Sequence, residues 1–107
     1  MSKTLKNTLL LTSVQNAREK NGVPDRIKIY VFGSAVYHTK PRDVDLLFIY
    51  DETQDPPNTA YSKIRPMLFT LAADFETPIH PIILSKSELA ESEFMDIAEP
   101  VLVPNGA

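Results

Sequence analysis

The sequence contains no cysteine and no long run of apolar residues. Without cysteine the chain can form neither a disulfide nor a thiolate zinc site, so the redox compartment stays open. The leucines at 9–11 are followed at once by Thr12 and Ser13, which makes this run too short for the apolar region of a signal peptide. No stretch approaches the length of a membrane span. We therefore expect a cytoplasmic protein without a membrane partner.

An excess of positive charge is also lacking. The formal net charge is −3 and the sequence pI is about 5.3. Extended nucleic-acid binding relies on many lysine and arginine contacts to phosphates, so this charge argues against it. A small anionic ligand stays compatible with the sequence if a metal ion supplies the positive charge.

The length of 107 residues suits a single domain at 1–107, and 43% hydrophobic with 23% charged residues is typical of a globular chain. Asn58 is expected to cap a helix, Pro66 to delay or kink that helix, and Pro81 to mark a sheet edge or a bulge. The order of elements predicts an α/β fold with a short mixed β-sheet of about three or four strands, covered by helices on one face. The expected elements are a helix at 4–20, strands at 26–32 and 43–50, a helix at 58–75, a strand at 79–84 and a helix at 85–98.

The chemistry is concentrated at the ends of the first two predicted strands. The first strand ends at Gly33 and Ser34, and such a turn presents backbone N–H groups and a hydroxyl that suit phosphate oxygens. Asp43 and Asp45 begin the second strand, and side chains two residues apart leave the same face about 7 Å apart along the strand. Two carboxylates in an apolar strand are costly unless cations neutralise them, so the pair indicates a metal site.

This pattern resembles the signature of the nucleotidyltransferase superfamily that includes DNA polymerase β, a hydrophobic residue with Gly-Ser, a spacer, and Asp-hydrophobic-Asp-hydrophobic. The resemblance covers about residues 27–84 of the chain, and the short length is similar to the minimal nucleotidyltransferases, small domains often encoded beside a helical partner. It implies binding of Mg²⁺ or Mn²⁺ and of a nucleoside triphosphate, expected to be ATP. Gly33 and Ser34 would bind the β- and γ-phosphates, and Asp43 and Asp45 would coordinate the metal ions.

The resemblance also implies a third carboxylate on a neighbouring strand, and His80 stands where we expect it. His80 could be a general base, a nitrogen ligand to a softer metal such as Mn²⁺ or Zn²⁺, or a structural residue. Glu76, upstream of the strand, is a second candidate if the loop folds back, although an exposed residue at a helix end is the simpler interpretation. A histidine in place of the third carboxylate affects catalysis more than nucleotide binding, because Asp43 and Asp45 can still hold the metal that accompanies the triphosphate.

Two functions of different classes follow. The first is an enzyme that transfers a nucleoside monophosphate, expected to be AMP, to a hydroxyl of a protein or a small molecule. The second is a catalytically impaired module of the same fold that acts by binding a partner protein, as the antitoxin of a toxin–antitoxin pair would. His80 favours the second, whereas the intact Gly-Ser and Asp-x-Asp favour the first. The short chain and Pro81 also predict a homo-oligomer, or a helical partner or substrate-binding subunit that completes the site.

Overall fold

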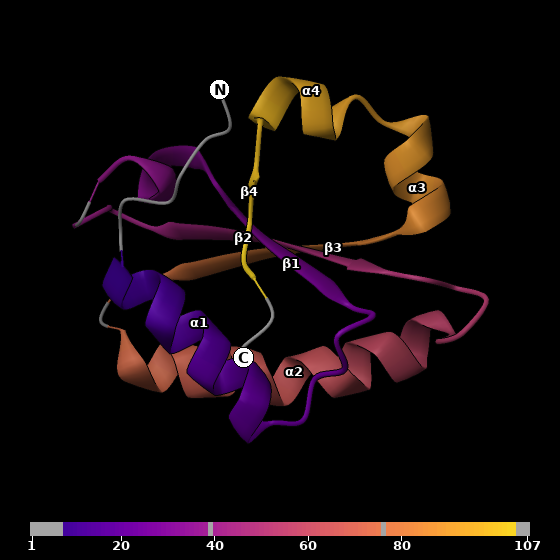
Figure 1. Ribbon diagram of the computed structural model, residues 1–107, viewed down its shortest axis with the longest axis horizontal. Helices are drawn as coiled ribbons and strands as arrows, with labels where there is room; N and C mark the ends of the chain where they lie inside the picture. The colour runs from indigo at the N-terminus through magenta and orange to yellow at the C-terminus, as the bar shows by residue number, and fades with distance from the viewer. Residues whose placement is uncertain (1–7, 39, 76, 105–107) are drawn as a thin grey trace.

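The computed structural model describes residues 8–38, 40–75 and 77–104 and has the expected α/β architecture. Figure 1 shows α1 and α2 on one side of the sheet, as the prediction of helices on one face requires, whereas the short α3 and α4 lie on the other side, which the sequence did not indicate. No helix in the described ranges is long and apolar enough to cross a membrane. In chain order the elements are α1 (Thr8–Lys20), β1 (Lys28–Phe32), the 3₁₀ helix η1 (Gly33–Val36), β2 (Val44–Tyr50), α2 (Pro57–Asp74), β3 (Ile79–Ser85), α3 (Lys86–Glu91), α4 (Phe94–Ala98) and β4 (Val101–Leu102).

The sheet is mixed and has four strands in the order β3-β2-β1-β4. β1 pairs antiparallel with both β2 and β4, whereas β2 and β3 run parallel. Parallel neighbours require a long crossover connection, and α2 supplies it between β2 and β3. β3 is therefore an edge strand, which confirms the indication from Pro81, because a proline lacks the amide that a second neighbouring strand would need.

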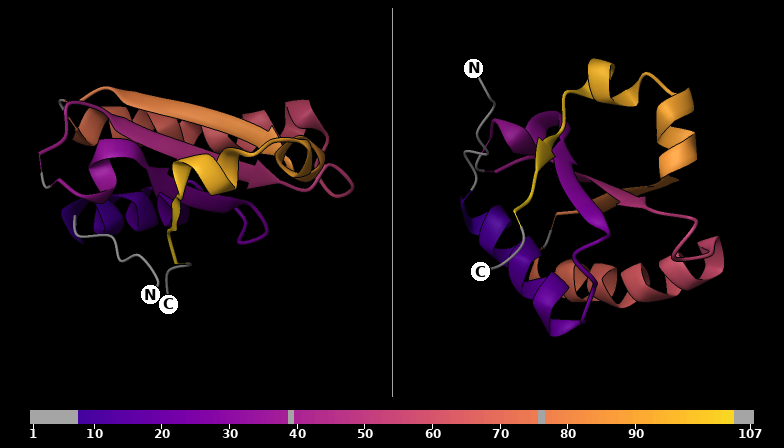
Figure 2. Two further views of the ribbon diagram at one scale, coloured as in Figure 1. Left: turned by 90° about the horizontal axis from the view of Figure 1, so that it is seen from above. Right: turned by 45° about the vertical axis from the view of Figure 1, so that its right-hand side comes forward.

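The hydrophobic core lies between the sheet and the two long helices α1 and α2 (Figure 2). Successive side chains of a strand point to opposite faces, and Val44, Leu46 and Phe48 of β2 are buried in this core. The same alternation turns Asp45 and Leu47 to the other face of the sheet. The core side chains of the two helices are Leu10, Val14 and Ala17 of α1 and Ala60, Ile64, Met67 and Leu71 of α2.

α2 differs from the sequence prediction at its start. The helix begins at Pro57 with Pro56 in the N-cap position, so the prediction of Asn58 as the cap is wrong. Proline is favourable at the first helical position because the amide it lacks would have no partner within the helix. Pro66 does not delay the start, since α2 runs through it to Asp74. Pro66 is exposed, so the carbonyl that loses its helical amide partner lies on the solvent side.

The C-terminal region also differs from the prediction of one helix at 85–98. A capping box of Ser85 and Glu88 begins α3, but α3 ends at Glu91 and a second helix, α4, begins at Phe94. Ser92 explains the break, because its hydroxyl donates to the Leu89 carbonyl at 2.9 Å and accepts from the Phe94 amide at 3.3 Å. Such local side-chain hydrogen bonds compete with helix continuation.

The sequence did not predict β4, because a strand of two residues is too short to show periodicity. Leu102 pairs with Tyr30 and Val101 with Val31, and the Val103 amide donates to the Ile29 carbonyl at 2.8 Å. Val101 and Val103 are buried in the core. The segment after Pro100, for which the sequence predicted no strand, therefore closes the sheet beside β1 over its described residues.

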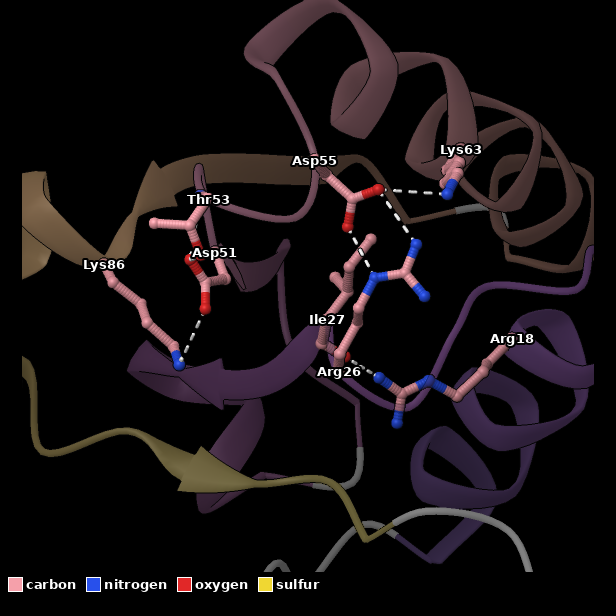
Figure 3. Close-up of polar contacts among 8 residues, drawn as sticks. All are labelled: Arg18, Arg26, Ile27, Asp51, Thr53, Asp55, Lys63 and Lys86. Atoms are coloured by element: carbon pink, nitrogen blue, oxygen red, sulfur yellow. Dashed lines mark hydrogen bonds and ion pairs between the residues drawn. The ribbon is translucent and has the colours of Figure 1, made fainter.

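A buried carboxylate joins three separate segments near the start of β1 (Figure 3). Asp55, in the loop between β2 and α2, accepts two hydrogen bonds from Arg26, at 2.7 and 2.9 Å, and one from Lys63 of α2 at 3.0 Å. These partners hold the pKa of Asp55 well below its usual range, with the Arg26 hydrogen bond as the largest cause. Close by, the buried Arg18 of α1 donates to the Ile27 carbonyl. These contacts fix the residues that precede β1 against α1 and α2.

We predict that Asp55→Asn lowers the free energy of unfolding at neutral pH. A carboxyl whose pKa is lower in the folded state than in the unfolded state stabilises the fold above its unfolded pKa, and this contribution is lost as the pH falls toward the folded pKa. The difference between wild type and variant in urea unfolding should therefore be full near pH 7 and shrink below about pH 4. Asp74→Asn, which removes an exposed carboxyl, is the control and should show no such loss. A constant difference across this pH range would contradict the prediction.

Candidate active site

The turn after β1 brings the backbone against the side chain of Asp45. Gly33 begins η1 with φ +71°, a left-handed conformation that side chains rarely adopt. A Cβ atom added at Gly33 would lie 2.5 Å from Oδ2 of Asp45. Glycine is thus required here for its conformation and for the room it leaves. Ser34 follows and is exposed, and its carbonyl accepts from the amides of Tyr37 and His38 at 3.1 and 3.0 Å, which closes the turn.

The register of the sheet brings two carboxylates and an imidazole together. Asp45 pairs with Phe32 of β1 on one side and with His80 of β3 on the other. Nδ1 of His80 lies 3.5 Å from Oδ1 of Asp45 and 3.7 Å from Oδ2 of Asp43. One ligand atom of each residue lies within 4.8 Å of the others. This group of Asp43, Asp45 and His80, which we call the Asp-Asp-His group, is compact enough for one divalent ion.

The Asp-Asp-His group is accessible, because His80 is 60% exposed and Asp43 37%, whereas Asp45 at 24% is the most covered. Partial burial raises the pKa of Asp45, the charge of Asp43 raises it further, and His80 acts in the opposite direction. The charged form of Asp45 is therefore disfavoured by its surroundings, and a cation would favour it. The donor set of two carboxylates and one imidazole fits a divalent metal ion.

A segment distant in the sequence covers part of the sheet face that carries the Asp-Asp-His group. The ring of Phe94 in α4 packs edge-on against Phe32, with ring centroids 5.0 Å apart. Phe32 immediately precedes Gly33, so α4 lies beside the phosphate-binding turn predicted from the sequence. Nothing in the local sequence of Phe94 indicates this position, because the contact depends on the break between α3 and α4.

The residues predicted to form the site lie on one side of the sheet. Gly33 and Asp45 are in direct proximity, and Asp45, Asp43 and His80 form one group. Ser34 is exposed at the same turn. The phosphate-binding role of Gly33 and Ser34 and the metal-binding roles of Asp43 and Asp45 stay predictions. Glu76, the other candidate for the third carboxylate, lies outside the described residues.

No protein-family model matches the chain, and no curated protein sequence matches it. The solved structure of a candidate nucleotidyltransferase from Sulfolobus solfataricus is similar, with a TM-score of 0.50 over 90% of this chain and 80% of the other, at 16% sequence identity. At this identity the similarity concerns the fold. The chain thus has a nucleotidyltransferase-like fold that carries a group of side chains able to hold a metal ion.

We predict that Gly33→Ala impairs ligand binding beyond its effect on stability. Gly22 offers a matched control, because its φ is +64° but a Cβ there would meet nothing within 4 Å. Both substitutions place alanine in a left-handed conformation, which costs about 1–2 kcal/mol. Only Gly33→Ala should also displace Asp45 and reduce the stabilisation by Mn²⁺ with ATP in a thermal unfolding assay. An equal response of the two variants to the ligands would refute the steric role of Gly33.

Proposed function

We propose that the chain, as one domain, is a nucleotidyltransferase of the minimal kind that binds ATP with a divalent metal ion and transfers AMP to a hydroxyl of a protein or a small molecule. The observation that supports this is the Asp-Asp-His group beside the Gly33 turn on a nucleotidyltransferase-like fold. Phosphate oxygens at the turn would place a triphosphate next to the metal ligands. The exposure of His80 leaves one side of the group open to an acceptor.

The reaction would be an in-line displacement at the α-phosphorus. The acceptor hydroxyl oxygen forms the new P–O bond, the bond to the β-phosphate oxygen breaks, pyrophosphate leaves, and the hydroxyl proton passes to a base or to water. A bound divalent ion would supply charge stabilisation for the attacking and leaving oxygens. Asp43 and Asp45 would hold that ion, and Gly33 with Ser34 would bind the β- and γ-phosphates. Neither aspartate needs to carry a proton.

The alternative is a catalytically impaired module that acts by binding a partner protein, such as the toxin of a toxin–antitoxin pair. Two observations favour it. His80 stands opposite Asp45, where the family resemblance implies a carboxylate. In addition, Leu68 and Phe69 of α2 and Ile79 and Pro81 of β3 line an apolar groove at the sheet edge, and Phe69 is 70% exposed. A homo-oligomer or a helical partner would cover such a surface.

We predict that Mn²⁺ or Mg²⁺ together with ATP raises the unfolding temperature, because a ligand that binds only the folded state stabilises it by mass action. Asp43→Asn combined with Asp45→Asn should abolish this shift, since the metal ligands are lost. Asp25→Asn combined with Asp74→Asn removes the same charge from two exposed positions and should keep it. An unchanged shift in the Asp43 and Asp45 variant would remove the metal assignment.

We predict that His80→Ala lowers nucleotide transfer and that His80→Asp retains or raises it with Mg²⁺. General-base assistance at this position is worth roughly 10²–10⁴ in rate. Transfer is measured with α-labelled ATP and a panel of acceptors that includes the neighbouring gene product. Full activity of His80→Ala would exclude a catalytic role for His80. Transfer by His80→Asp but not by wild type would identify a nucleotide-binding module without activity, in favour of the alternative.

A further inference from the structure

The Asp-Asp-His group contains one nitrogen donor where the family resemblance implies a third carboxylate oxygen. We propose that Asp43, Asp45 and His80 bind one transition-metal ion, with Mn²⁺ preferred over Mg²⁺, and that His80 contributes Nδ1 as a direct ligand. This proposal rests on the proposed function, because the ion is the one that would accompany the nucleotide. It identifies the ion that the site selects.

The distances suit joint ligation. Two ligand atoms that are each about 2.1 Å from a metal lie roughly 3.0–3.5 Å apart when the angle at the metal is 90–110°. Nδ1 of His80 is 3.5 Å from Oδ1 of Asp45 and 3.7 Å from Oδ2 of Asp43. The three ligand atoms lie within 4.8 Å of one another, so small rotations of the imidazole and of the carboxylates would bring them into this range, and the 60% exposure of His80 leaves room for its rotation.

The backbone of His80 is constrained in a way that suits a ligand. Pro81 follows it, and a residue before proline is restricted to extended conformations. The β2–β3 pairing sets His80 directly opposite Asp45. The proline thus restricts the backbone of His80 and the pairing sets its side chain on the same face as Asp45, so little backbone entropy would be lost when an ion binds.

The exposure of His80 also argues against a purely structural role. An imidazole that is 60% exposed buries little surface, and its Nδ1 lies within 4 Å of two carboxylates. Ligation through Nδ1 would withdraw this nitrogen from proton transfer, so the proposal also separates the ligand role from that of a general base acting through the same atom.

The chemistry of the donor set gives the selectivity. Mg²⁺ is a hard cation that takes oxygen ligands and keeps much of its water, so an imidazole adds little to its binding. Imidazole suits first-row transition metals, and carboxylates suit Mn²⁺ as well as Mg²⁺. A site of two carboxylates and one imidazole therefore gains affinity for Mn²⁺ from His80, whereas a site of three carboxylates would serve Mg²⁺ equally.

The test is Mn²⁺ binding to the full chain without nucleotide, followed by electron paramagnetic resonance. Loss of the signal of aqueous Mn²⁺ measures affinity, Mg²⁺ competition measures selectivity, and pulsed spectra detect coupling to a coordinated imidazole nitrogen. We expect Mn²⁺ to bind at least about tenfold more tightly than Mg²⁺ and to show nitrogen coupling. His80→Asp should lose the coupling and most of the selectivity.

Two further variants complete the design. His80→Ala should lower Mn²⁺ affinity by roughly 10–100-fold, because even the loss of an outer partner of a metal site has effects of that size, and should change Mg²⁺ affinity less. His38→Ala removes the only other histidine of the chain, which is exposed, and should keep affinity, selectivity and nitrogen coupling. Circular dichroism checks that each variant is folded.

The outcomes separate this proposal from the proposed function. Bound Mn²⁺ without nitrogen coupling, or equal affinities for Mn²⁺ and Mg²⁺, would overturn His80 as the selecting ligand while ATP and metal still stabilise the fold. Absence of Mn²⁺ binding both with and without ATP would overturn the metal site and the proposed function together. Nitrogen coupling that disappears in His80→Asp and persists in His38→Ala would support the proposal.

Discussion

The register between β2 and its two neighbours sets Phe32, Asp45 and His80 in one row across the sheet. The remaining features of the candidate site depend on this row. A shift by one residue in the β2–β3 pairing would turn His80 to the opposite face, because side chains alternate along a strand. The apolar residues of β3 oppose such a shift, since Ile79 and Ile83, which pack against the core, would then turn away from it.

A second constraint is the contact between Gly33 and Asp45. The turn after β1 comes so close to the carboxylate that no side chain fits, and the same proximity would bring a bound phosphate near a bound metal ion. Partial burial and the charge of Asp43 raise the pKa of Asp45, so a bound cation would stabilise the charged form of this carboxylate. The electrostatics thus favour a cation beside Asp45, close to the turn at Gly33.

The two faces of the sheet carry different groups of residues. The face toward α1 and α2 carries the hydrophobic core, while the other face carries the Asp-Asp-His group and is partly covered by α3 and α4. Asp55, held by Arg26 and Lys63, fixes the β2–α2 loop to the start of β1. The core and the ion pairs of Asp55 can therefore maintain the strand register without contacts from the residues of the site. The site can contain clustered charge because the fold does not depend on it.

The local sequence determined much of this architecture. Apolar alternation and turn residues predicted α1, β1, β2, α2 and β3 to within a few residues over the described ranges, and the motif indicated Gly33, Asp43 and Asp45, because these signals act over short distances along the chain. The pattern could not decide on which face His80 lies, since periodicity permits either. It also missed β4, and it joined α3 to α4. Those features depend on contacts between distant segments, such as Val101 with Val31 and Phe94 with Phe32, which only tertiary packing brings together.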